Sequence, residues 1–305
     1  MKRFQILDQI ISNIPYINKQ LKLLNDCGYE PGHYYSPIPD LIEIKKREDT
    51  IFNKKQIELN GINLYNEKQL SLLKLFIPFY NEIPYDFKNE EHSNTRYKVK
   101  DAWYRYSDVI MLCCMLRHFK PKRIIEVGSG YSSAVMLDIN EQFLEGETFM
   151  SFIEPYPERL KNLLRNDDHK NCEILESFIQ EIDPAFFSCL GENDILFIDS
   201  SHVSKVGSDL NYIFFEILPI LKPGVLIHFH DIYYPFEVPK HWIQDKKWFW
   251  NETYLLRAFL SYNSEFKIIN FNSYLQQVYR DWFEINMPFC LKGEKDTGSI
   301  WLQKN

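Results

Sequence analysis

Residues 123–137 read RIIEVGSGYSSAVML, a short apolar run that carries one acidic residue and then meets two glycines. The β-branched residues around Glu126 favour a buried strand. Gly128 and Gly130 permit a tight bend and a close approach of backbone that a Cβ would block. The segment from Ser133 to Phe143 predicts a helix. A strand, a glycine turn and a helix in this order predict a place where a small molecule approaches the backbone.

From Lys122 onward, short β-branched runs alternate with helical segments. This alternation predicts a doubly wound α/β fold around a mostly parallel, seven-stranded sheet. The predicted strands are residues 123–127, 148–153, 173–175, 194–198, 225–230, 266–270 and 299–303. The predicted helices between them are residues 133–143, 157–165, 184–190, 204–221 and 252–262.

The first hundred residues are less regular. After a helix-like start, residues 28–41 read GYEPGHYYSPIPDL, in which prolines and glycines interrupt regular pairing. Further helices are predicted at residues 67–77, ended by Pro78, and from Ser107 or Asp108 as a cap. We therefore divide the chain into a mostly helical amino-terminal extension, residues 1–95, and a ligand-binding domain, residues 96–305.

Composition excludes several classes of protein. Lys and Arg total 35 against 42 Asp and Glu, a formal charge of −7, which argues against nucleic acid as the main partner. Six cysteines without CxxC spacing favour a reduced, cytoplasmic setting. Polar residues interrupt the start of the chain, so no secretion signal is expected, and no apolar run reaches the ~18 residues of a membrane span. Oligomeric state is not readable from the sequence.

Ligands of doubly wound sheets bind beyond the carboxyl ends of the strands. At the first end, Ser133 stands where a dinucleotide fingerprint has Gly or Ala, which disfavours NAD. At the second end, Glu154 follows the strand directly, 28 residues after Glu126. A carboxylate there can accept hydrogen bonds from a ribose diol. The alternative is a solvated acid at a strand end.

The run Glu126-Val127-Gly128-Ser129-Gly130, together with Glu154 and residues 194–199, resembles the motifs of class I S-adenosylmethionine (SAM) methyltransferases. The resemblance covers about residue 96 to the carboxyl terminus. More narrowly, FIDSSHVSKVGSDL followed by HFHDIYYPFEVP resembles the bacterial subfamily related to macrocin O-methyltransferase, many of whose members act in glycan or natural-product tailoring.

The resemblance implies SAM as the cofactor. Its nucleoside and methionine parts would lie on the glycine turn, with Glu154 at the ribose hydroxyls and Ser177 and Phe178 at the adenine edge. The implied cofactor-binding residues are Glu126, Gly128, Ser129, Gly130, Ser133, Glu154, Ser177, Phe178 and Asp199.

An oxygen nucleophile must lose its proton during methylation. His202 follows the fourth strand in a loop that faces the same crevice, and its ordinary pKa of ~6.5 suits a general base. The alternative is a histidine that caps the next helix or binds backbone. His230 is a second catalytic candidate, which assists His202 or stabilises developing charge.

A divalent metal is a separate question. Related O-methyltransferases bind one with an acid after the fourth strand and an acidic pair after the fifth, and here that pair reads His230-Asp231. The candidate ligands are therefore Asp199, His230 and Asp231. Imidazole suits a transition metal better than magnesium. Regular alternation would place His228 and His230 on one face of the strand and Asp231 on the other.

The sequence thus predicts a SAM-dependent methyltransferase that acts on a hydroxyl of a sugar, glycan or natural product. Two alternatives stay open: an NAD-linked oxidoreductase or epimerase on a similar fold, and a non-catalytic SAM-binding scaffold.

Overall fold

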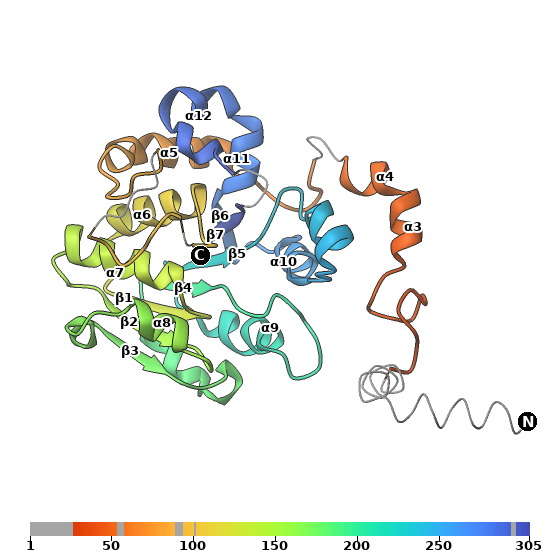
Figure 1. The fold of residues 1–305 in the computed structure, drawn as a ribbon, viewed down its shortest axis with the longest axis horizontal. Coiled ribbons are helices and arrows are strands. Elements are labelled where there is room, and N and C mark those ends of the chain that lie inside the picture. The colour runs from red at the N-terminus through yellow and green to blue at the C-terminus, as the bar shows by residue number, and fades with distance from the viewer. Residues whose placement is uncertain (1–26, 54–57, 89–93, 101, 294–296) are drawn as a thin grey trace, which may run out of the picture. The chain divides into compact units, whose positions relative to one another are not determined.

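A computed structural model describes residues 27–53, 58–88, 94–100, 102–293 and 297–305 (Figure 1). Packing divides the chain into two compact units. The first comprises residues 1–54 and 240–249, and the second comprises residues 55–239 and 250–305. The functional boundary expected between residues 95 and 96 stays a prediction. The helix-like start of the chain lies outside the described residues.

The second unit is built on a seven-stranded sheet in the order β3-β2-β1-β4-β5-β7-β6. Strands β1 to β5 run parallel, and β7 pairs antiparallel with both β5 and β6. Their bounds are β1 Arg123–Val127, β2 Phe149–Ile153, β3 Cys172–Leu175, β4 Ile195–Ile198, β5 Leu226–His230, β6 Phe266–Phe271 and β7 Ser299–Lys304. The predicted mostly parallel sheet is confirmed, and no predicted strand differs by more than one residue at either end.

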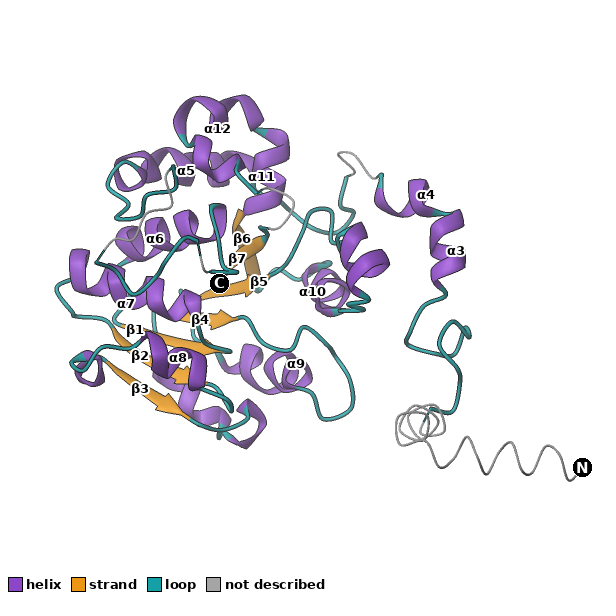
Figure 2. Cartoon of the chain, in the orientation of Figure 1, coloured by secondary structure: helices purple, strands orange, loops and turns teal. Residues whose placement is uncertain are grey.

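The strand order reverses between β1 and β4. From β1 the chain returns to β2 on one side, whereas from β4 it returns to β5 on the other side. Because such crossovers are right-handed, the connecting helices lie on opposite faces of the sheet, as α7 and α9 do in Figure 2. The carboxyl ends of β1 and β4 therefore flank the switch point, which is where sheets of this kind bind their ligands.

Helices cover both faces of this sheet. The helix α6 is buried from Ser107 to Leu116 and packs between α5 and α7, so the apolar run of the sequence forms core. The helices of this unit are α5 Asn66–Tyr80, α6 Ser107–Phe119, α7 Tyr131–Phe143, α8 Glu158–Leu163, α9 Asp209–Tyr212, α10 Glu252–Leu260, α11 Asn272–Val278 and α12 Arg280–Asn286. A π-helical segment spans Ile213–Ile217, and 3-10 turns span Asp168–Lys170, Ile179–Glu181, Pro184–Cys189, Leu218–Ile220 and Pro288–Leu291.

Three helix predictions were wrong in detail. Pro78 does not end its helix, because α5 continues to Tyr80 and Asn81 N still donates to Ile77 O. The helix expected from Ser204 begins only at Asp209, because Gly207 has a left-handed φ of 71° and Ser208 caps α9. Residues 184–189 form a 3-10 turn rather than an α-helix.

Neither Ser107 nor Asp108 caps α6 as predicted. Tyr106 occupies the cap position, and the Asp108 carboxylate lies fully inside the protein. It accepts hydrogen bonds from Ser299 Oγ at 2.8 Å and from Gly298 N at 3.2 Å. The start of α6 is thereby tied to β7.

Buried Arg96 links the segment that precedes α6 to the helix α7. The Arg96 guanidinium donates to Asp138 on α7 at 3.0 Å and, through Nε, to Asp168 at 2.9 Å. The backbone amides of Arg96 and Tyr97 donate to the same Asp138 carboxylate. The side chains of Arg96, Asp138 and Asp168 are at most 6% exposed, so one guanidinium pairs with both carboxylates away from water.

Within its described residues, the first unit contains the short helices α3 Leu41–Lys46 and α4 Glu48–Phe52 and a π-helical segment, Trp242–Lys246. Asp40 caps α3 and accepts from Ile42 N at 2.8 Å. The Glu48 carboxylate pairs with Lys45 at 2.8 Å and with Lys240 at 2.9 Å, so residues 240–249 are tied to α4 within this unit.

Candidate functional site

The glycine turn after β1 has no room for a side chain. Gly128 has a φ of 80°, and a Cβ at this residue would lie 1.9 Å from the carbonyl oxygen of Asp199. Gly128 N donates to Ile153 O at 3.0 Å, and Asp199 N donates to Val127 O at 2.9 Å. The carboxyl ends of β1, β2 and β4 therefore meet at this turn, and glycine is required there.

Glu126 supports the turn from inside. It is fully buried, and its Oε1 accepts from Ser132 Oγ at 2.5 Å while Oε2 accepts from Ser133 Oγ. Gly130 N in turn donates to Ser133 Oγ at 2.9 Å. Burial raises the pKa of Glu126 to about 8, although the two serine bonds oppose this. Glu126 and Ser133 thus shape the turn, and Gly128, Ser129 and Gly130 form its backbone.

Glu154 lies beside the bend, as its predicted role requires. Its Oε2 accepts from Ser129 N at 3.1 Å, and its Oε1 accepts from Tyr156 N at 2.9 Å. The buried hydroxyls of Ser129 and Ser200 have no hydrogen-bond partner among the described residues. Buried polar atoms are normally paired, so the two unpaired hydroxyls at this bend are candidates for hydrogen bonds to a polar ligand.

Two exposed aromatic rings stand near Glu154. Phe178, after β3, is 48% exposed, and its ring lies edge to face with Tyr156 at 6.1 Å between centroids. Ser177 Oγ donates to Glu181 Oε2 at 2.6 Å. Tyr156 was not predicted, because a tyrosine between two prolines gives no signal for binding. The ring pair supplies a flat apolar surface of the kind that contacts a nucleobase.

His202, after β4, is surrounded by carboxylates. Its Nε2 lies 3.4 Å from Asp199 Oδ1 and 3.7 Å from Asp231 Oδ2, and its Nδ1 lies 2.7 Å from Glu252 Oε2. The ring stacks on Trp250 at 4.4 Å between centroids. His202 therefore does not cap the following helix with its side chain.

His230 ends β5 and joins the same group. Its Nδ1 lies 3.1 Å from Asp199 Oδ1 and 3.6 Å from Asp231 Oδ2, and its Nε2 lies 3.5 Å from Asp108 Oδ2. The expectation that Asp231 would point to the opposite face was wrong. The strand ends at His230, and the left-handed φ of 58° at Asp231 turns its carboxylate back toward the histidine.

His228 lies on the same face as His230 but belongs to the core. Its ring is fully buried and stacks on Phe197 at 4.0 Å and against Trp301 at 4.6 Å. Burial lowers its pKa well below the ordinary value, so it is neutral.

The charges of the cluster shift each pKa in a definite direction. Burial alone would lower the pKa of His202, but Asp199, Glu252 and Asp231 overcome this and raise it to about 10. The His230 pKa is likewise raised against the effect of burial by Asp231 and Asp199. Burial raises the pKa of Asp231 to about 6, while the two histidines hold that of Asp199 low despite its burial.

The three predicted metal ligands converge. One donor atom from each of Asp199, His230 and Asp231 lies within 4.8 Å of the others. Two carboxylates and an imidazole fit a divalent transition metal better than magnesium, which prefers oxygen alone. The same atoms also satisfy one another as ion pairs, so the donor set fits a metal without requiring one.

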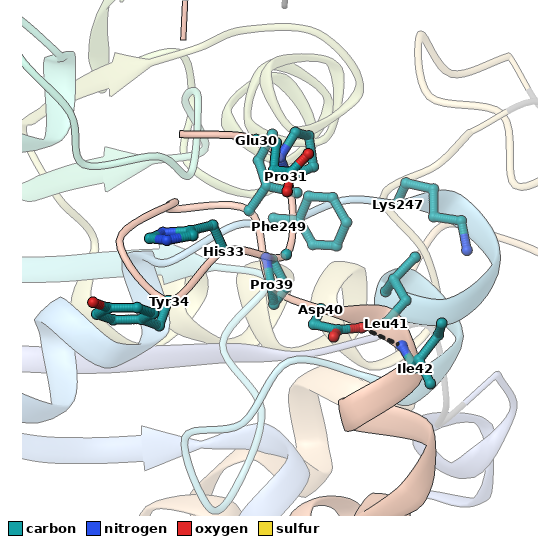
Figure 3. A pocket seen from close by; sticks show the side chains of 12 residues that line it. Glu30, Pro31, His33, Tyr34, Pro39, Asp40, Leu41, Ile42, Lys247 and Phe249 are labelled. Atoms are coloured by element: carbon teal, nitrogen blue, oxygen red, sulfur yellow. Dashed lines mark hydrogen bonds between the residues drawn. The ribbon is translucent and has the colours of Figure 1, made fainter. Parts of the chain in front are cut away.

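A separate cavity of about 950 Å³ lies wholly in the first unit (Figure 3). Its lining includes Pro31, Pro39 and Phe249, with Glu30 and Lys247 as charged groups. None of the predicted site residues lines it. The candidate site is therefore distinct from this cavity, because its residues lie at the strand ends of the second unit.

Residues 125–232 match a family model described as a methyltransferase domain. This segment begins in β1, ends just after β5 and includes every predicted site residue. The chain therefore contains a methyltransferase domain, and its mostly parallel, seven-stranded sheet is the fold predicted for a SAM-dependent enzyme of this kind. An uncharacterized protein of Archaeoglobus fulgidus is 32% identical over 170 residues, which cover 55% of this chain and 76% of the relative. The chain belongs to the same family as this archaeal protein.

Solved structures with a similar arrangement include three methyltransferases. The SAH-bound Podospora anserina methyltransferase PaMTH1 is 14% identical, with a TM-score of 0.41, over 88% of this chain and 99% of that one. TomG from Streptomyces achromogenes, in complex with SAM, is 12% identical, with a TM-score of 0.42, over 86% and 96%. A Bacillus cereus O-methyltransferase, in complex with SAH, is 10% identical, with a TM-score of 0.42, over 86% and 97%.

Among the described residues, none of the helices combines the length and apolar character needed to cross a membrane.

Proposed function

We propose that this methyltransferase binds SAM across Gly128, Ser129 and Gly130 and transfers its methyl group to a hydroxyl of a sugar, glycan or natural product. The observation that carries the cofactor assignment is the hydrogen bond between Glu154 and Ser129 N, which holds the acid beside the bend. When bound, SAM supplies an electrophilic methyl group on a sulfonium. The chain has to orient that group and exclude water from it.

Each element of the bend has a distinct role in this proposal. Gly128 lets the bend pack against the Asp199 carbonyl, and the unpaired hydroxyl of Ser129 binds a polar part of the nucleoside or methionine. Glu154 turns toward the ribose hydroxyls, and Phe178 with Tyr156 contacts the adenine ring. Asp199, directly after β4, contacts the bend through its carbonyl and the two histidines through its carboxylate.

His202 is the proposed general base. Its Nδ1 is held by Glu252, which leaves Nε2 on the side of Asp199 and Asp231. A positive charge in the crevice disfavours a second cation nearby, so a bound sulfonium lowers the raised pKa of the imidazole. His230, held at Asp199, stabilises the charge of the acceptor oxygen as its proton leaves.

A divalent ion at Asp199, His230 and Asp231 is a further proposal. It would polarise the acceptor oxygen and lower the pKa of its hydroxyl. Exhaustive treatment with EDTA tests it: we expect activity to fall and to return with Mn²⁺ or Zn²⁺. Undiminished activity in metal-free buffer would contradict a role for the metal.

The acceptor class rests on the resemblance of residues 197–210 and 228–239 to the macrocin O-methyltransferase subfamily. The test is transfer of tritium from [methyl-³H]SAM to a panel of nucleotide sugars, glycosides and hydroxylated aglycones. We expect label on a hydroxyl of at least one sugar-containing acceptor. Binding of SAM with no turnover on any acceptor would instead favour the scaffold alternative.

A further inference from the structure

We propose that Glu252 is a positioning residue, which fixes the orientation and tautomer of His202 for proton removal. This inference rests on the proposed role of His202 as the base. Glu252 comes 50 residues later in the chain and lies outside the matched methyltransferase segment.

Glu252 holds His202 through both side chain and backbone. Its Oε2 lies 2.7 Å from His202 Nδ1, and both side chains are buried, at 3% and 8% exposure. The amides of Asn251 and Glu252, at the start of α10, donate to the His202 carbonyl at 3.1 and 3.2 Å. His202 has a left-handed φ of 59°, so its backbone needs such support.

The contacts leave the imidazole one orientation. Trp250 covers a face of the ring at an interplanar angle of 30°. A carboxylate can only accept a hydrogen bond, so Nδ1 carries the hydrogen that faces Glu252. The other nitrogen, Nε2, faces Asp199 and Asp231 and carries a hydrogen in the imidazolium form. Once the imidazole is neutral, Nδ1 keeps its hydrogen at Glu252 and Nε2 is the nitrogen that holds the lone pair.

A purely structural role does not explain this carboxylate. Its helix is not capped by a side chain, and Glu252 Oε1 has no hydrogen-bond partner among the described residues. Burying an acid without a partner costs free energy. The short bond with His202 Nδ1 is the contact that offsets this cost, so the position of the carboxylate is set by the histidine. Sequence reasoning missed it because nothing local marks a helix-start glutamate as the partner of a distant histidine.

The test is a double-mutant cycle with Glu252→Gln and His202→Ala, measured with the panel acceptor that gives the highest turnover. We expect Glu252→Gln to lower kcat at least ~10-fold. The KM for the acceptor and the Kd for SAH should change less than twofold. On the His202→Ala background, Glu252→Gln should cause no further loss, because Glu252 acts through His202.

Two outcomes overturn the inference, and they are distinguishable. If His202→Ala lowers kcat while Glu252→Gln does not, or if the two losses multiply, His202 remains the base and the role of Glu252 fails alone. If His202→Ala keeps its kcat, the proposed base fails and the inference fails with it.

A spectroscopic measurement needs no acceptor. The ¹H–¹⁵N spectrum should show a strongly downfield imidazole proton that is absent in His202→Ala. Glu252→Gln should shift or remove it, and Glu252→Asp should retain it in part. Glu265→Gln, at an exposed glutamate that pairs with Lys304, is the matched control and should leave it unchanged. A downfield proton unchanged in Glu252→Gln contradicts the proposal.

Discussion

At the scale of single residues, the candidate site depends on the absence of a side chain at Gly128 and on the protonation of the buried Glu126. Gly128 and Gly207 both have left-handed φ angles, of 80° and 71°. A Cβ at Gly128 would meet the Asp199 carbonyl at 1.9 Å, whereas one at Gly207 would have nothing within 4 Å. Alanine variants at the two glycines therefore separate two effects: both variants strain the backbone, but only the one at Gly128 also creates a steric clash.

We expect Gly128→Ala to weaken SAH binding at least ~10-fold, because the end of β4 must move away from the turn. Gly207→Ala carries only the strain, on the order of 1 kcal/mol, and should bind SAH normally. Isothermal titration with SAH, together with the unfolding midpoint, measures both. Equal affinity in the two variants would show that the turn does not contact the ligand.

Glu126 predicts a pH dependence of stability. Its pKa in the folded protein is about 8, above the ordinary 4.5, because it is buried. Between these values the folded state holds a proton that the unfolded state has released, so stability falls as pH rises from about 4.5 to about 8.

Glu126→Gln removes this titration. The difference in unfolding free energy between variant and parent should therefore change in favour of the variant as pH rises across this window, by up to a few kcal/mol. Urea unfolding at pH 5 and pH 8 measures it, with the exposed Glu284→Gln as control. A pH-independent difference would contradict the assignment of a raised pKa.

At the scale of elements, the strands could be predicted because their apolar, β-branched runs are short and bounded. Burial on both faces makes such runs nearly continuous, as in β4, where all four residues are buried. The helices were less predictable, because tertiary contacts decide their ends. Pro78 inside α5 and the late start of α9 are examples.

Substitution of Arg96 tests how much its ion pairs with Asp138 and Asp168 stabilise the fold. Arg96→Ala leaves Asp138 and Asp168 buried without their cation, and we expect it to lower the unfolding free energy by about 3–5 kcal/mol. The matched control is Lys170→Ala, whose partner Asp167 is 81% exposed, and it should not change the unfolding midpoint measurably. Denaturant titration compares them. Similar midpoints for the two variants would show that the Arg96 pairs do not stabilise the fold.

At the scale of the whole molecule, the sequence predicted the candidate site residues that follow strands but not the residues that hold the two histidines in place. The glycine turn, Glu154, His202 and the His230-Asp231 pair each follow a strand, so the rule for strand ends applies to them. Glu252, Trp250 and Asp108 come from helices or loops distant in sequence, and only the fold brings them to the histidines.

The central claim is that the bend beside Glu154 seats SAM, and calorimetric titration of the full chain with SAM, SAH and NAD tests it most directly. We predict one site per chain for SAM and SAH, no saturable binding of NAD, and at least ~10-fold weaker SAH binding in Glu154→Ala, which loses the carboxylate proposed for the ribose hydroxyls. Saturable NAD binding without SAM binding, or full SAH affinity in Glu154→Ala, would contradict the account.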